Sequence, residues 1–480
     1  MQTQKSAELN FLSKLSSKNE FLNDIPIIRS PKMEIEDESS GQIQDLIDLS
    51  LSSSYKKIRR SSKPQTIPLM ATIKTKDVKV QDKRLGLDLI FIVDVSSSMM
   101  GSKIELVQET LSFILGELAP QDRVSIVKFC HESQILTPLM PMTKENVLKA
   151  KNLVFSRLGC YGNTDIIKGL KDGFDVLLNR RQVNDLTSIF FLSDGEDTNG
   201  NSMKSFQDFI DLQDRLCKEK MMDFSINCFG YGRDHDEKVL GMLAAKKQGN
   251  FYYIKDLKRV DECFIDCFGK LISTFAVNAE INIFLNGNTR FVNKYGHSWS
   301  QDNMIGKATI NVKTIAAGFE THYLADIEVP PIAYGEEVLK VAIAILTYDS
   351  NGQGSSLSNE LKLTIIDSND LGEINHVVEE ESVRLKLADL VIKVEDKVEK
   401  KNFLDAEKLV NDFKGQVVFN KNITPTFAQK ALKWVSHDMK DAKYSTQLRY
   451  AINNRQAAPE CEEMMQFNCV QSDMLYRKRK

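Results

Sequence analysis

Three short segments of this chain gather oxygen-bearing side chains of the kind that hold hard divalent cations. Residues 94–98 (DVSSS) directly follow an apolar run, residues 162–165 (GNTD) lie between two helical patterns, and residues 193–197 (SDGED) directly follow a second apolar run. Carboxylate and hydroxyl oxygens suit Mg2+ better than they suit softer metals. The three segments therefore predict a Mg2+ site, with Mn2+ or Ca2+ as alternatives.

The pattern around the first segment places its polar residues at the end of a strand. Five apolar residues over 89–93 predict a strand that is buried on both faces. Apolar residues then recur every three or four positions from Ile104 to Leu118, which predicts an amphipathic helix. An open α/β sheet builds its sites at the carboxyl ends of strands in this way. We expect the three segments to meet above one crevice of such a sheet.

Strand and helix patterns alternate throughout residues 85–276. This alternation predicts βαβ units, and hence a doubly wound, mostly parallel, Rossmann-like sheet that is covered by helices on both faces. After the opening strand and helix, the expected strands are 123–130, 187–192, 222–230 and 251–254, and the expected helices are 144–158, 165–178, 205–220, 238–247 and 260–276. Residues 134–142 read as a loop.

The pattern changes to alternating apolar and polar residues after position 277. Such alternation predicts an antiparallel β-sandwich over 277–370. Residues 66–84 have the same half-buried character, so we expect them to contribute a strand or strands to it. The α/β domain is then inserted in, or flanked by, the sandwich. A helical region over 371–455 and a flexible tail over 456–480 complete the predicted order.

The first 65 residues are polar and rich in serine. They predict a mostly disordered region with one short helix near 42–50. Residues 56–63 form a basic run, for which a solvated linker is the favoured interpretation. A phosphorylation site at Ser62 and a localisation signal are the alternatives.

Composition limits the classes of partner and compartment. The 480 residues predict two to four domains. The net charge is −3, which offers no electrostatic case for nucleic acid or an acidic membrane. No apolar run is long enough to span a membrane, and the N-terminus lacks the apolar core of a signal peptide. The eight cysteines form no CxxC pair, and we expect Cys263 and Cys267 to share a helix face. These features favour free thiols and a cytoplasmic, or else nuclear, location.

The three segments, taken in order, resemble the DxSxS…T…D pattern of the metal-ion-dependent adhesion site in von Willebrand factor A (vWA) domains. The resemblance implies that Ser96 and Ser98 bind the ion directly and that Thr164 binds it directly or through water. It implies that Asp94 and Asp194 act mainly through bound waters. It further implies that an Asp or Glu of a protein partner completes the coordination shell.

Helix capping is the alternative explanation for these residues. Asp94 and Ser96 could cap a helix that begins near Ser98, and Thr164 or Asp165 could cap the next helix. Any one segment alone would favour capping, but the three together favour the metal site.

Other candidate residues carry weaker signals. We interpret His235 as a solvated loop histidine. Cys130 and His131 are expected to point to opposite faces of a strand, which would prevent them from pairing. Glu196 and Asp197 either tune the site or cap the segment that follows them.

The resemblance extends to residues 229–254 and to the order of domains. A sandwich after the vWA domain and a helical C-terminus resemble plant-type vWA proteins that carry a RING finger and act as ubiquitin ligases. Inter-α-inhibitor-like proteins share the flanking sandwich, and the resemblance covers about residues 66–415. A RING finger needs eight Cys or His ligands, whereas residues 1–65 contain neither residue type. Ubiquitin-ligase activity therefore does not carry over.

The sequence thus predicts a non-enzymatic adaptor that docks a partner's carboxylate through Mg2+. Three alternatives are open: a scaffold subunit that borrows a RING from another chain, a Mg2+-dependent hydrolase, and a structural component of a large assembly. The sequence leaves the oligomeric state undetermined.

Overall fold

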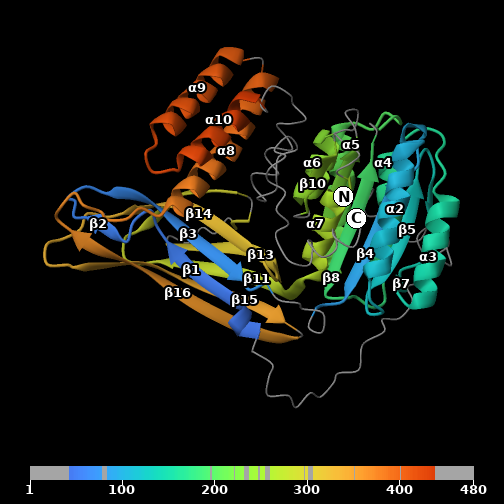
Figure 1. Cartoon of the computed structure of the whole chain (residues 1–480), viewed down its shortest axis with the longest axis horizontal. Coiled ribbons are helices and arrows are strands. Elements are labelled where there is room, and N and C mark those ends of the chain that lie inside the picture. The colour runs from blue at the N-terminus through green and yellow to red at the C-terminus, as the bar shows by residue number, and fades with distance from the viewer. Residues whose placement is uncertain are drawn as a thin grey trace, which may run out of the picture. The chain divides into compact units, whose positions relative to one another are not determined.

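The chain forms two compact units (Figure 1). The computed structural model describes residues 43–437 except 78–83, 195–196, 221, 232–236, 247–248, 255–259, 297, 301–305, 351 and 401. Within this range the first unit comprises residues 85–272, and the second comprises the residues on both sides of it. The α/β unit is therefore inserted in the sequence of the second unit, which agrees with the predicted fold class.

The first unit is built on a seven-stranded sheet with the order β10-β9-β8-β4-β5-β6, in which β7 also pairs with β5. The strands from β10 to β5 are parallel, whereas β6 and β7 are antiparallel to β5. The bounds are β4 (Leu87–Asp94), β5 (Arg123–Phe129), β6 (Ser133–Ile135), β7 (Met140–Pro141), β8 (Leu186–Ser193), β9 (Ser225–Tyr231) and β10 (Phe251–Ile254). The predicted loop at 134–142 is wrong, because β6 and β7 are too short to show a period.

Helices cover both faces of this sheet. Helix α2 contacts α3 and α7, whereas α5 contacts α4 and α6, so the helices form two groups. The bounds are α2 (Ser102–Glu117), α3 (Lys144–Arg157), α4 (Ile166–Leu178), α5 (Met203–Glu219), α6 (Glu237–Lys246) and α7 (Val260–Ile272). The prediction that the last helix reaches residue 276 is wrong, because Thr274–Leu285 form strand β11 of the second unit.

The strand order places a topological switch point between β4 and β8. From β4 the chain moves to β5 on one side, and it then returns to β8, β9 and β10 on the other. All eight residues of β4 and all eight of β8 are buried, as expected for strands covered on both faces. Ligands of open α/β sheets bind outside the carboxyl ends of the strands at such a point. Here these ends carry Asp94 and Asp194.

The second unit contains a β-sandwich of two sheets, with the orders β1-β3-β14-β12 and β13-β11-β15-β16-β2. Its strands pair antiparallel, except that β2 runs parallel to β16. Apolar side chains of both sheets form one core between them. The bounds are β1 (Ile47–Ser52), β2 (Lys57–Arg59), β3 (Gln65–Thr75), β11 (Thr274–Leu285), β12 (Arg290–Lys294), β13 (Lys307–Ala316), β14 (Glu320–Val329), β15 (Val338–Ser350) and β16 (Gln353–Ile366).

The prediction of disorder over 1–65 is wrong for residues 47–59, where the structure has β1 and β2. A short 3-10 helix, η2 (Ile43–Leu46), stands where a helix over 42–50 was expected. Residues of the basic run 56–63 belong to strand β2 and contact other parts of the second unit, so the interpretation of this run as a solvated linker is wrong. Arg60 Nε lies 2.8 Å from Asp367 Oδ1, and Arg60 Nη2 donates to the Glu336 carbonyl at 2.8 Å. Residues 1–42 lie outside the described residues.

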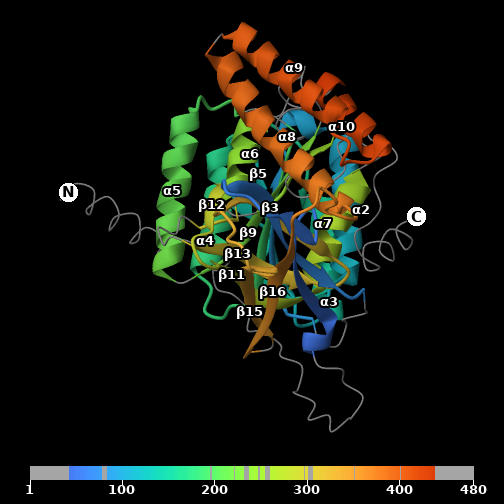
Figure 2. The same ribbon diagram turned by 90° about the vertical axis from the view of Figure 1, so that its left-hand side faces the viewer.

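Three helices, α8 (His376–Glu399), α9 (Phe403–Phe419) and α10 (Pro425–His437), pack side by side (Figures 1 and 2). Helix α8 also lies on the outer face of β3 and β14, where Met70 and Leu324 pack against Val378 and Leu385. Strand β3 is therefore covered on both faces rather than half-buried as predicted. The predicted helical stretch after 437 and the predicted tail lie outside the described residues.

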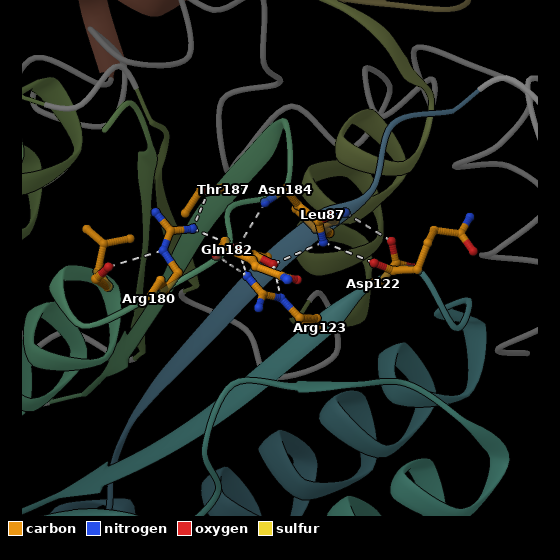
Figure 3. Close-up of polar contacts among 10 residues, drawn as sticks. Leu87, Asp122, Arg123, Arg180, Gln182, Asn184 and Thr187 are labelled. Atoms are coloured by element: carbon orange, nitrogen blue, oxygen red, sulfur yellow. Dashed lines mark hydrogen bonds and ion pairs between the residues drawn. The ribbon is translucent and has the colours of Figure 1, made fainter. Parts of the chain in front are cut away.

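A buried ionic network fixes the amino-terminal end of β4, opposite the end that carries Asp94 (Figure 3). Arg123 donates to both oxygens of Asp88, at 2.8 and 2.7 Å, and Arg180 Nη1 donates to Asp88 Oδ2 at 2.7 Å. Asn184 Nδ2 adds a bond of 3.0 Å to Asp88 Oδ1. The side chains of Asp88, Arg123 and Arg180 are 0% exposed, so this network ties β4, β5 and the chain after α4 together without solvent.

Replacing Asp88 should strongly destabilise the first unit. Asp88→Asn leaves two buried guanidinium groups without their shared carboxylate, so we expect the free energy of unfolding to fall by about 3 kcal/mol. Urea unfolding of the full chain, read by pulsed alkylation of the 0%-exposed Cys228, measures this change.

The matched control is Lys218→Met, because the Lys218 side chain pairs with Asp214 at the surface and is 75% exposed. Its effect should be under about 1 kcal/mol. Equal effects of the two substitutions would contradict the stabilising role of the network.

Candidate metal centre

Asp94 is the last residue of β4, and it is 0% exposed. Its Oδ1 accepts a hydrogen bond from the Ser96 backbone N–H at 2.8 Å, and its Oδ2 accepts one from Ser193 Oγ at 2.6 Å. Burial raises the pKa of Asp94 to about 6, against the opposing effect of the hydrogen bonds from Ser193 and Ser96; the charge of Asp194 raises it further. Asp94 is therefore a desolvated carboxyl group close to a second one.

A chain of hydrogen bonds runs from the end of β4 to the end of β8. Ser96 Oγ lies 3.0 Å from Ser98 Oγ, and Ser98 Oγ donates to Asp194 Oδ1 at 2.7 Å. Asp194 directly follows β8, and its side chain is 0% exposed. Ser96 stands at the N-cap position of the 3-10 helix η3 (Ser97–Met99), but its side chain accepts no capping bond. The structure thus brings together four of the five predicted residues, and capping does not explain Ser96.

Thr164 belongs to a loop that is hydrogen-bonded to the segment after β4. The Ser97 backbone N–H donates to the Gly162 carbonyl at 3.0 Å. Gly162 has φ +72, a conformation that favours glycine, and a Cβ there would lie 2.2 Å from Nδ1 of the exposed His131 side chain, which would have to move. Thr164 is 3% exposed, and its backbone N–H donates to Thr198 Oγ1 at 2.9 Å. The hydrogen bond from Thr164 to Thr198 is not predicted by the sequence, because a single threonine in a polar loop has no distinctive pattern.

Two acidic residues of these loops accept hydrogen bonds from backbone N–H groups at the start of helix α4. The Asp165 side chain accepts from the Lys168 backbone N–H at 3.3 Å, which confirms the prediction that this residue can act as a cap. Asp197 Oδ2 accepts from the Ile166 backbone N–H at 3.0 Å. Asp197 therefore caps α4. Its Oδ1 also accepts from the backbone N–H groups of Asn199 at 3.0 Å and Asn201 at 3.3 Å, which confirms the prediction that it caps the segment that follows it. Glu196 and His235 lie outside the described residues.

Lys103 is the charged residue at this site that the sequence interpretation missed. Its Nζ forms an ion pair with Asp194 Oδ2 and donates to the Ser98 carbonyl at 3.2 Å. Lys103 lies in the first turn of α2, where a lysine would ordinarily be assigned to solvent. A residue pattern alone does not reveal which carboxylate a long side chain reaches.

Cys130 and His131 do approach each other, because they lie in the turn after β5 rather than on the strand. Cys130 Sγ is 3.5 Å from His131 Nδ1, so the prediction that they cannot pair is wrong. Cys130 is nevertheless only 1% exposed. Cys263 and Cys267 are both buried on α7, as expected of one helix face. The six cysteines in the described part of the chain are free thiols.

The donor set fits a hard divalent cation. Two buried carboxylates and three hydroxyls supply only oxygen atoms, and Lys103 shows that the Asp194 carboxylate attracts a cation. Across the described segments, no group of three or more His, Cys, Asp or Glu side chains is placed to hold a metal ion. The hydroxyls are therefore essential to any metal site at this position.

Comparison with known proteins agrees with the predicted class of fold. Residues 88–264 match the model of the von Willebrand factor type A domain, so this part of the chain is a vWA domain. A solved structure described as von Willebrand factor type A from Catenulispora acidiphila is similar with a TM-score of 0.62 at 14% identity. The similarity covers 85% of this chain and 96% of that one, so the fold is shared well beyond the vWA domain.

Relatives by sequence include the two groups that the motifs resemble. E3 ubiquitin-protein ligase WAVH1 from Arabidopsis thaliana is 32% identical over 127 residues, which are 23% of this chain and 18% of that protein. Inter alpha-trypsin inhibitor heavy chain 4 from Mus musculus is 30% identical over 168 residues, which are 34% of this chain and 17% of that protein. The chain thus spans less than a fifth of the length of either relative. None of the helices that the structure describes is long and apolar enough to cross a membrane.

The raised pKa of Asp94 predicts how the stability of the metal-free protein depends on pH. The folded state keeps the Asp94 proton up to about pH 6, whereas the ordinary pKa is 3.8. The contribution of this group to stability is therefore complete below pH 3.8 and lost as the pH rises through 6. The loss should be about 2–3 kcal/mol.

Urea unfolding in EDTA, followed by far-UV circular dichroism between pH 4 and pH 7.5, measures this loss. Asp94→Asn should remove it. The fluorescence of the two tryptophans, Trp299 and Trp434, reports on the second unit alone and serves as the control. Parallel pH profiles for the wild type and Asp94→Asn would contradict the assignment.

Proposed function

We propose that this chain is a protein-binding adaptor whose vWA domain captures an acidic side chain of a partner through a divalent cation. The hydrogen-bonded chain from Asp94 through Ser96 and Ser98 to Asp194 is the observation that carries the proposal. It places two carboxylates and two hydroxyls at the carboxyl ends of β4 and β8, where the strand order favours a ligand site.

Each residue has a distinct role in this proposal. Ser96 and Ser98 bind the cation directly, Thr164 binds it directly or through water, and Asp94 and Asp194 hold it through bound waters. When bound, the cation supplies a coordination position that a carboxylate of the partner fills. Mg2+ is the favoured ion, since it keeps several waters and prefers oxygen ligands; Mn2+ and Ca2+ are alternatives.

Hydrogen bonds keep the acidic groups oriented toward the ion. Ser193 Oγ and the Ser96 N–H hold the two oxygens of Asp94, and the surrounding burial strengthens attraction to a cation. Because Asp94 and the Asp194 side chain are 0% exposed, a substrate has no direct access to either carboxylate, so they suit holding a cation better than removing a proton from a substrate. We therefore propose binding rather than catalysis as the role of the site.

A scaffold role in a ubiquitin-ligase complex is the second candidate. Similarity to E3 ubiquitin-protein ligase WAVH1 favours it, in a form in which another chain supplies the RING finger. Both candidates fit a cytoplasmic protein, because free cysteines such as those described are typical of a reducing compartment.

Metal binding can be tested with two neighbouring serines. Ser98→Ala removes a proposed ligand and should weaken Mn2+ binding at least about tenfold. Ser97→Ala is the matched control, because Ser97 is exposed and contacts Gly162 through its backbone. Isothermal titration of the full chain with MnCl2 gives both affinities. Equal affinities for the two variants, or no binding by the wild type, would contradict the proposed site.

Partner capture tests the mechanism as a whole. The immobilised full chain should retain its partner in Mg2+ and release it in EDTA, and Asp94→Ala should fail to capture it in either condition. Mass spectrometry of the eluates measures this. A partner that stays bound in both tests would overturn the metal-bridged mechanism, and a RING protein among such partners would instead support the scaffold role.

A further inference from the structure

We infer that Lys103 is an internal counter-cation of the metal centre, which occupies Asp194 when the divalent cation is absent and thereby lowers the affinity of the site for metal. The inference rests on the proposed function, since it concerns the same site. In this inference, Lys103 determines the metal concentration above which the site can bind a partner.

The contacts of Asp194 leave neither of its oxygens unoccupied. Ser98 Oγ donates to Oδ1 at 2.7 Å, while the Lys103 ammonium group contacts Oδ2. Lys103 Nζ also donates to the Ser98 carbonyl at 3.2 Å. The ammonium group therefore binds two consecutive members of the proposed ligand chain and neutralises one of its carboxylates.

The position of Lys103 in α2 indicates that Asp194 holds it there. Lys103 is the second residue of the helix, which follows Gly101 with φ +85. Positive charge in the first turn of a helix is opposed by the helix dipole, so this lysine gains nothing from its own helix. The Asp194 side chain is 0% exposed and supplies the compensating charge.

A divalent cation among Ser96, Ser98 and Asp194 would lie beside this ammonium group. Like charges at such short range in a poorly solvated site repel strongly. The Lys103 side chain is 30% exposed, which gives its flexible end a route to solvent. Metal binding must either displace the ammonium group from Asp194 or place the metal ion next to it. In both cases the affinity for the metal is lower than it would be without Lys103.

Lys168 provides a matched control of the same charge. Its Nζ lies 3.4 Å from Asp165 Oδ2 and donates to the His131 carbonyl at 2.6 Å. Asp165 caps α4 and is not among the proposed ligands. Removing the charge of Lys168 therefore changes the general potential around the loops without touching the ligand chain.

The test compares Mn2+ affinity in three variants of the full chain by isothermal titration. Lys103→Met removes the charge while it keeps an unbranched side chain only one atom shorter, and it should tighten Mn2+ binding about tenfold or more. Lys103→Arg keeps the charge and should stay close to wild type, and Lys168→Met should change the affinity less than about twofold. Unchanged or weaker binding by Lys103→Met would overturn the inference, and so would equal gains in Lys103→Met and Lys168→Met.

Thermal unfolding in EDTA separates this inference from the proposed function. Without metal, Lys103→Met leaves the buried Asp194 carboxylate without its cation, so the vWA unit should melt at a lower temperature than in the wild type or Lys168→Met. If the wild type binds no Mn2+, the proposed function fails, yet a lower melting temperature still supports the counter-cation. An unchanged melting temperature overturns the inference whatever the wild type binds.

Discussion

Burial of carboxylates at the ends of strand β4 is the constraint on which the rest of the vWA unit depends. Asp88 near its start and Asp94 at its end are both 0% exposed, and a buried charge is costly unless it is compensated. At Asp88, two fully buried guanidinium groups supply the compensation permanently. At Asp94, hydroxyl and amide groups supply hydrogen bonds but no charge. The protein's own guanidinium groups thus compensate the charge at one end of the strand, whereas the proposed cation would supply the compensating charge at the other.

The insertion of the vWA unit depends on a different constraint, the pairing of strands that are distant in sequence. Strand β3, before the inserted unit, pairs with β14, after it, over the register from Gln65↔Val329 to Lys74↔Glu320. This register fixes both parts of the second unit in one sheet. The α/β unit has its own sheet and core, so the sandwich needs no residue of the vWA unit to complete its strand order.

The sequence predicts those parts of the structure whose signal is long or repeated. Strands β4 and β8 are continuous apolar runs, and the helices of the vWA unit have clear periodicity, so the α/β fold follows from local pattern. The short strands β1 and β2 cannot be predicted in this way. With six and three residues, they are too short for a pattern of apolar and polar residues that distinguishes an edge strand from a loop or helix. The contacts of Thr198 and Lys103 cannot be predicted in this way, because they depend on how distant segments meet rather than on local spacing.

We propose that the ends of β4 and β8 form one cation site. Anomalous diffraction from crystals of the full chain soaked in MnCl2 tests it most directly. We expect one strong manganese peak between Asp94 and Asp194, in contact with the hydroxyls of Ser96 and Ser98. No peak between the two strand ends, or a peak only at a site elsewhere on the chain, would contradict it.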